Sequence, residues 1–181
     1  MSDAVREAVE VLRGGGVISH ACEGVWGFAC DPFNETAVQR VLTLKQRPAA
    51  KGLIVIAHDA SQFEPELALL DHNRRAEIEL SWPGHTTWVL PTQRFPPIVT
   101  GDFATIAARV PAHEQALSLA ACFAGPLVST SANVANDPPC QTEQEVRAQF
   151  TLELDYIVPG KTSGAKGPSI IFDAGNGARI R

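Results

Sequence analysis

The apolar run at residues 53–57, Leu-Ile-Val-Ile-Ala, constrains the fold of this chain more than any other feature. Five adjacent apolar residues are typical of a central strand with both faces buried. Helical and strand-like stretches alternate along the chain on either side of this run. The pattern predicts an α/β fold in which helices flank a twisted open sheet that is mixed or rich in parallel pairs.

Apolar spacing and capping residues place the predicted elements. Asp3 is predicted to cap the first helix and Asn34 the second, and Thr142 with Glu145 forms a capping-box pattern. The segment 21–31 is predicted to be a loop that leads into a strand. Helices are predicted over 3–13, 35–45, 61–70, 73–81, 111–123 and from 142, and strands over 17–20, 53–57, 86–90, 105–110, 127–130, 155–158 and 169–173.

Composition limits the class of protein. The 181 residues include 45% hydrophobic and 19% charged residues, which is an ordinary globular balance, and we predict one domain over 1–181. The formal net charge of −5 means that a nucleic acid or nucleotide would need a local basic patch. The chain shows neither a secretory signal nor an apolar run of transmembrane length, and its four cysteines are scattered. We expect a cytoplasmic protein without a structural metal and without a membrane partner.

The first of three polar clusters contains Lys45, Arg47 and Lys51, which lie between a predicted helix and the strand at 53–57. Cations gathered in this way can converge on phosphate oxygens. The alternative is that they only complement the dipole at the helix C-terminus. A nucleotide would not be held by a Rossmann turn or a P-loop, because neither glycine pattern occurs in the sequence.

The second cluster, Ser129 to Asn133, follows an apolar strand. Ligands of open α/β sheets bind at the carboxyl ends of strands, and Ser and Asn side chains can bond a phosphate or a ribose. The alternative is a turn that caps its own backbone.

The third cluster is built around Arg109, an arginine in the otherwise apolar strand that begins near Thr105. Burying an unpaired charge is costly, so Arg109 should have an anionic partner, which is either a protein carboxylate or a ligand. Cys22 is a further candidate, but no nearby His or helix N-terminus is apparent that would activate it as a nucleophile.

Taken together and in this order, the motifs resemble the YrdC-like family, which contains the threonylcarbamoyl-adenylate synthases. The resemblance extends from about Val17 to Arg181. It rests on Lys45-x-Arg47-Pro48, Trp82-Pro83-Gly84, Arg109-Val110-Pro111, Ser129-Thr130-Ser131-Ala132-Asn133 and Pro168-Ser169-Ile170-Ile171-x-Asp173.

The resemblance implies an enzyme with a large, concave, basic pocket. Its substrates would be ATP with Mg²⁺, L-threonine and bicarbonate, and its product would pass to a tRNA threonylcarbamoyl-transferase complex. Lys45 and Arg47 would be the catalytic cations. The positions that match the family's ATP site are Lys45, Arg47, Lys51, Thr105, Ser131, Asn133 and Arg181, and those near threonine are Cys22, Arg109, Ser129 and Ser169.

The sequence departs from the family pattern at two places. Ala21-Cys22-Glu23 stands where the family has Pro-Thr-Glu, and His85 follows Trp82-Pro83-Gly84 where the family has a second proline. Two alternatives to the synthase remain, the first because a basic concave surface could hold RNA and the second because of Ala21-Cys22. One is a module that binds tRNA or double-stranded RNA, or acts in ribosome maturation, and the other is a paralogue with a changed acceptor substrate.

Overall fold

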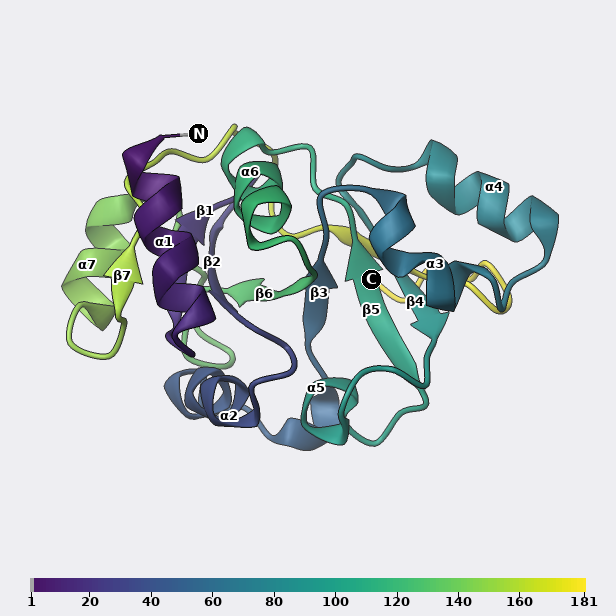
Figure 1. The fold of residues 1–181 in the computed structure, drawn as a ribbon, viewed down its shortest axis with the longest axis horizontal. Coiled ribbons are helices and arrows are strands. Elements are labelled where there is room, and N and C mark those ends of the chain that lie inside the picture. Colours follow the sequence, from purple (N-terminus) through teal and green to yellow (C-terminus); the bar gives the residue numbers. More distant parts are fainter. Residues whose placement is uncertain (1) are drawn as a thin grey trace.

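The computed structural model describes residues 2–181, whose strands form a single mixed sheet (Figure 1). The strand order is β7-β1-β2-β6-β3-β5-β4-β8, so the two C-terminal strands lie at opposite edges. The strands are β1 (Ile18–Ala21), β2 (Trp26–Cys30), β3 (Ile54–Ile56), β4 (Thr86–Pro91), β5 (Thr105–Arg109), β6 (Leu127–Ser131), β7 (Tyr156–Ile157) and β8 (Ile170–Asp173).

The apolar run predicted from sequence is the centre of this sheet. β3 lies between β6 and β5, and Val55, Ile56 and Ala57 are buried. The expected mixed sheet is confirmed, but it is not rich in parallel pairs. Within residues 2–181, three pairings are parallel (β1–β7, β3–β5 and β4–β8) and four are antiparallel.

Helices cover both faces of the sheet, as the two-sided burial of β3 requires. The apolar sides of α1 and α6 pack with Ile18, Leu127 and Ile56 on one face. The core on the other face includes residues of α2, α3, α4, α5 and α7. The helices are α1 (Asp3–Arg13), α2 (Glu35–Leu44), α3 (Glu64–Leu67), α4 (His72–Leu80), α5 (Pro97–Thr100), α6 (Glu114–Phe123) and α7 (Glu143–Phe150), with 3-10 turns at Ala49–Lys51 and Ala60–Phe63.

Several helix ends differ from the prediction. Ser2, not Asp3, caps α1, because the Ser2 side chain accepts the backbone N–H of Val5. α6 begins at Glu114 rather than at residue 111, since the preceding segment is extended up to the cap His113. The short helix α5 was not predicted, because four residues are too few to show a helical period. The Asn34 cap and the Thr142–Glu145 capping box are confirmed.

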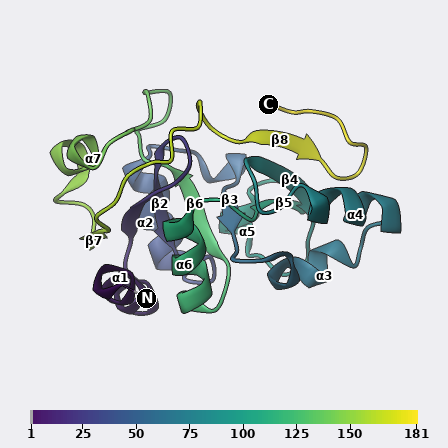
Figure 2. The same ribbon diagram turned by 90° about the horizontal axis from the view of Figure 1, so that it is seen from above.

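The C-terminal segment crosses the sheet from one edge to the other. It leaves β7 beside α1 and α7, passes α6, and reaches β8 beside β4 (Figure 1). Seen from above, the segment starts at β7 beside α1 and crosses over, so that β8 lies on the side away from α1 and α6 (Figure 2). Each strand is rotated by roughly 20–25° relative to its neighbour, and this rotation adds up across the sheet. The face that points to α1 and α6 at one edge therefore points to the side of the C-terminal segment at the other edge.

The sheet positions the site through this twist. At the β1 end, α1 and α6 cover this face of the sheet. At the β8 end the same face has no helix over it, and the C-terminal segment borders it (Figure 2). Within residues 2–181, no helix combines the length and the apolar character needed to cross a membrane.

Candidate functional site

Alternation along the strands brings polar residues to one face of the sheet. Thr105, Ala107 and Arg109 alternate along β5, and the register places Ala107 beside Ile54 of β3. Ser129 and Ser131 alternate in the same way along β6, where Ile56 pairs with Leu127 on the same face. The twisted face is therefore lined by hydroxyls and by one arginine in addition to aliphatic side chains.

A cavity of about 710 Å³ lies over this face. Its wall also includes Lys45 and Arg47 just after α2, Lys51 of the 3-10 turn and residues from the C-terminal segment. The structure brings all the residues predicted from sequence together in this wall, namely Cys22, Lys45, Arg47, Lys51, Thr105, Arg109, Ser129, Ser131, Asn133, Ser169 and Arg181. The roles assigned to them remain predictions.

Lys45 joins the first polar cluster to the second. It caps the C-terminus of α2, but its ammonium group points to the end of β6 and the loop after it, and the residue is 3% exposed. The Nζ atom donates to the Oδ1 atom of Asn133 at 2.9 Å and to the backbone oxygens of Asn133 and Ser131. Burial and the nearby Arg47 lower the pKa of Lys45 to about 8. The Lys45 ammonium group therefore fixes a loop at the cavity wall and does not only complement the dipole at the C-terminus of α2.

The loop after β6 also caps itself, as the alternative interpretation of the second cluster predicted. The Asn133 Nδ2 atom donates to the backbone oxygens of Val134 and Asp137, both at 2.8 Å. The Oγ atom of Ser131 donates to Asn133 Oδ1 at 2.6 Å. Ser131 and Asn133 are thus held rigidly beside Lys45, while both still line the cavity.

Arg47 and Arg181 supply positive charge from two distant parts of the chain. The Nε and Nη2 atoms of Arg47 donate to the Gly52 carbonyl at 3.1 and 2.9 Å. Gly52 has φ of +61°, a conformation that favours glycine and directs this carbonyl to the arginine. Arg181 donates to the Ser169 carbonyl at 3.0 Å, and burial together with Arg47 lowers the pKa of Arg181. Two cations that repel one another in this way are typical of an anion site.

Arg109 has the anionic partner that its position in an apolar strand predicted. That partner is a protein carboxylate, Glu23, which forms an ion pair with the Arg109 Nη2 atom. Arg109 also donates through Nε to the Gly84 carbonyl at 2.9 Å, and both charged residues are buried. Burial raises the pKa of Glu23, but Arg109, Cys22 and the backbone N–H of Ala112 outweigh it, so that the pKa is lowered overall.

Cys22 is a thiol and not a reactive thiolate. Its Sγ atom donates to the Oε2 atom of Glu23 at 2.7 Å. Burial and the neighbouring Glu23 raise the pKa of Cys22 to about 12. A thiol of this kind is a poor nucleophile, which agrees with the expectation from sequence that Cys22 is not activated.

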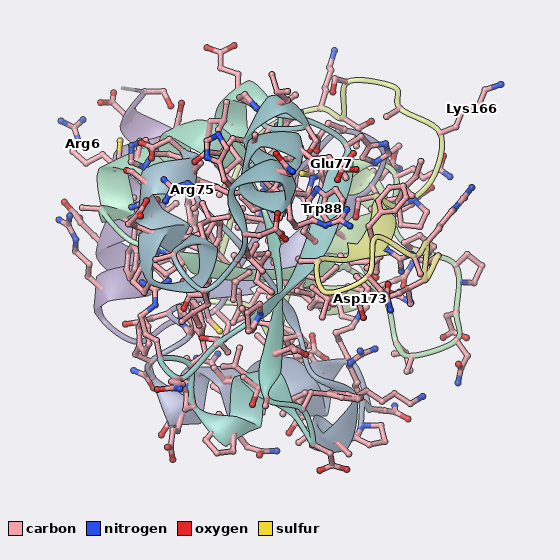
Figure 3. All side chains as sticks on the ribbon, turned by 90° about the vertical axis from the view of Figure 1, so that its right-hand side faces the viewer. Arg6, Arg75, Glu77, Trp88, Lys166 and Asp173 are labelled. Carbon is pink, nitrogen blue, oxygen red and sulfur yellow. The ribbon has the colours of Figure 1, made fainter. Side chains whose placement is uncertain are left out.

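Sequence reasoning missed several residues of the cavity wall, above all Glu23, His85, Phe103 and Asp173. Glu23 could have been identified, because it matches the glutamate of the family's Pro-Thr-Glu, while Ala21 and Cys22 replace the other two residues. Asp173 belongs to the Pro168-to-Asp173 motif that carries the family resemblance, whereas Phe103 has no comparable signal. Figure 3 shows Asp173 at the β8 edge, beside the loop after that strand, whereas Lys166 points away into solvent.

The charge balance and length of the cavity indicate what it can bind. Among the described residues of its wall, five are Lys or Arg and two are Asp or Glu, so the surplus is positive. Thr105 and Arg109 lie at opposite ends of β5, about 13 Å apart at 3.3 Å per residue. A ligand with a polyanionic part and a second polar end would fit this arrangement. Within residues 2–181, His, Cys, Asp and Glu side chains form no group of three or more that could hold a metal.

Comparison with known proteins finds a matching family and similar sequences. The Sua5/YciO/YrdC family model, described as telomere recombination, matches residues 10–181. A threonylcarbamoyl-AMP synthase of Nitrosococcus oceani is 46% identical over 98% of this chain and 96% of its own length. A threonylcarbamoyl-AMP synthase of Stenotrophomonas maltophilia is 45% identical over 96% of this chain and 95% of its own.

Solved structures extend this likeness to three dimensions. P. abyssi Sua5 complexed with L-threonine superposes with a TM-score of 0.88 and 29% sequence identity. The match covers 93% of this chain but 50% of the Sua5 chain. The family model spans far more than half of the sequence, and the relatives match almost end to end. The chain belongs to the Sua5/YciO/YrdC family.

Proposed function

We propose that the chain is a threonylcarbamoyl-AMP synthase, which converts L-threonine, bicarbonate and ATP into L-threonylcarbamoyl-AMP and pyrophosphate. The observation that supports it most is that one cavity gathers a cationic cluster and the buried Arg109. This agrees with the names of the relatives, which align with the chain over almost its whole length. The product would be the activated intermediate of a tRNA modification.

The reaction has two stages. The threonine amine first combines with CO₂ derived from bicarbonate to form a carbamate. A carbamate oxygen then attacks the α-phosphorus of ATP, and pyrophosphate leaves. Such chemistry requires mainly alignment and charge stabilisation from the protein.

The cationic cluster would hold the nucleotide. Arg47, Lys51 and Arg181 line the same cavity and could neutralise the phosphate oxygens. Lys45 would act with them and would also fix the loop that carries Ser131 and Asn133. Mg²⁺ would enter with the triphosphate and be held mainly by phosphate oxygens.

Arg109 would hold the amino acid. Glu23 and the Gly84 carbonyl occupy its Nη2 and Nε atoms, but its Nη1 atom makes no hydrogen bond within residues 2–181. The free N–H groups of this planar fork can donate to the threonine carboxylate. Ser129, Ser169 and Cys22 line the same cavity and would bind the rest of the amino acid, as in the family pattern.

The product is an acyl-phosphate anhydride and therefore needs a nearby acceptor. A tRNA threonylcarbamoyl-transferase complex would receive it. RNA binding by the cavity side of the chain would be a separate function from synthesis, and pyrophosphate release distinguishes the two.

The decisive experiment measures pyrophosphate release from ATP with bicarbonate and Mg²⁺, with and without L-threonine. We expect release only when threonine is present, because the carbamate is the nucleophile. Serine and other amino acids serve as controls for specificity. Release with another amino acid alone would identify a paralogue with a changed acceptor. If no amino acid supports release, while RNA binds with an affinity that falls steeply with salt, the chain is an RNA-binding module.

The substitution Cys22→Thr tests the amino-acid end of the cavity. We expect kcat/KM for threonine to be unchanged or higher, because a hydroxyl can replace the thiol as donor to Glu23 and is the stronger hydrogen-bonding group. The measurement is steady-state pyrophosphate release at varied threonine, with Cys122→Ser, outside the cavity wall, as control. A collapse of activity in the Cys22 variant alone would show that the thiol has a role of its own.

A further inference from the structure

His85 is a residue of the cavity that the proposed nucleotide and threonine contacts do not use. It follows the Trp82-Pro83-Gly84 turn and is partly buried, and its backbone oxygen accepts the N–H of Ile170 at the start of β8. That bond holds the His85 backbone between β4 and the C-terminal segment. The imidazole lines the cavity at the end where β5 finishes with Arg109.

The charged residues near His85 are Arg109 of β5, Glu23 after β1 and Arg181 at the end of the chain, and the backbone carbonyl of Gly167 also lies beside it. Burial and Arg109 lower the pKa of His85 from the usual 6.5. The imidazole is therefore neutral at physiological pH and has a lone pair with which to accept a proton.

The proposed reaction needs such an acceptor. Threonine enters as an ammonium ion, which has no lone pair and cannot attack CO₂. The Cys22 thiol is already protonated, and it donates its proton to Glu23. The Glu23 carboxylate accepts from Arg109, Cys22 and the N–H of Ala112, which makes it a weak base.

The remaining ionisable residues of the wall are also unsuitable. Lys45 is a donor to the loop after β6, and the arginines stay charged. Asp173 pairs in register with Val89, at the level of Ala107, about 7 Å along the sheet from the level of Arg109. Its Oδ1 atom accepts the backbone N–H groups of Gly175 and Asn176.

We propose that His85 is a catalytic residue of this chain, the general base that removes a proton from the ammonium group of threonine before carbamate formation. This inference rests on the proposed synthase function and goes beyond it. The threonine carboxylate on Arg109 would bring the ammonium group to the end of the cavity that His85 lines.

The proton balance of the step is complete. The ammonium group gives one proton to the imidazole and becomes an amine. The imidazolium passes that proton to bicarbonate, which releases CO₂ and water. The amine nitrogen then forms a bond to the carbon of this CO₂, and its second proton leaves to water, which yields the carbamate anion. No electrons are exchanged, and one proton is released to solvent in each turnover.

The test compares His85→Gln with the wild type by threonine-dependent pyrophosphate release between pH 6 and 9, roughly the range over which a histidine and an amine titrate. Glutamine keeps a polar side chain but cannot take up a proton. We expect kcat/KM for threonine to fall about 10²-fold or more at neutral pH. The variant's rate should rise about tenfold per pH unit, because it depends on the small fraction of free amine. Threonine affinity, measured by calorimetry, should change little.

Two further variants make the result specific. His85→Ala should regain activity when imidazole is added, because the cavity then admits an external base. His72→Gln removes an exposed histidine on α4, outside the cavity wall, and should behave as the wild type. Wild-type activity and an unchanged pH profile in His85→Gln would overturn the inference. Absence of threonine-dependent release in the wild type would instead refute the synthase function itself.

Discussion

Replacing Lys45 by alanine is expected to reduce pyrophosphate release by roughly 10²–10³-fold, the usual cost of losing one well-placed charge-stabilising donor. Lys45 is buried and lies at the cavity wall, where a low dielectric strengthens its interaction with phosphate. Arg47→Ala should have an effect of similar size on ATP use. Unchanged activity in both variants would contradict the phosphate-binding role of this cluster.

Lys45→Ala should also lower the free energy of unfolding, by about 1–3 kcal/mol, because buried acceptors lose their donor. The backbone oxygens of Ser131 and Asn133 and the Asn133 Oδ1 atom all accept from Lys45. Chemical denaturation should therefore show a weakened but folded protein. Lys166→Ala is the matched control, because this lysine points into solvent (Figure 3) and should change neither activity nor stability.

The pH dependence of ATP binding gives Lys45 a second signature. Its pKa is about 8 in the folded protein, against 10.5 ordinarily. ATP affinity of the wild type should therefore weaken as the pH rises through about 8, and Lys45→Ala should lack this weakening. Between about pH 8 and pH 10.5 the unfolded chain binds more protons than the folded one, so Lys45 makes the stability rise with pH in this range. Calorimetric titration with ATP across the same range tests whether ATP affinity weakens.

Breaking the buried pair of Glu23 and Arg109 is expected to be the most destabilising single change at the site. Removal of one partner leaves an uncompensated buried charge, which costs about 3–5 kcal/mol. Glu23→Ala also takes an acceptor from Cys22 and from the backbone of Ala112. For a chain of this size we expect the melting temperature to fall by about 10 °C.

Arg109→Ala should combine this loss of stability with weaker binding of threonine, since the Nη1 atom of Arg109 is the donor proposed for the threonine carboxylate. Circular dichroism at rising temperature measures the first effect, and threonine titration of the folded variant at low temperature measures the second. Arg6→Ala is the control, because its partner Asp3 is exposed on α1 and such surface pairs contribute little. Equal melting temperatures for Glu23→Ala and the wild type would show that the pair is unimportant.

Acid should weaken the same pair. The pKa of Glu23 is lowered in the folded protein, so its stabilising contribution is present above the ordinary pKa of 4.5 and is lost as the pH falls through the folded value. The stability difference between the wild type and Glu23→Gln should accordingly shrink in acid.

Much of the fold follows from local sequence. The apolar run at 53–57 determined the central strand, because five adjacent apolar residues need cover on both faces. Asn34 and the Thr142–Glu145 box determined where two helices begin, since capping is a contact over three residues. The requirement that Arg109 must have an anionic partner was also a sequence prediction, based on the cost of burying a charge.

Only the tertiary structure decided which residues meet. Sequence left two candidates for the partner of Arg109, a protein carboxylate or a ligand, and the structure identified Glu23, 86 residues away. The direction of the Lys45 side chain and the crossing of the C-terminal segment to the far edge of the sheet are likewise absent from local pattern. Propensity and spacing act over a few residues, whereas strand order and twist act over the whole sheet and place distant charges around one cavity.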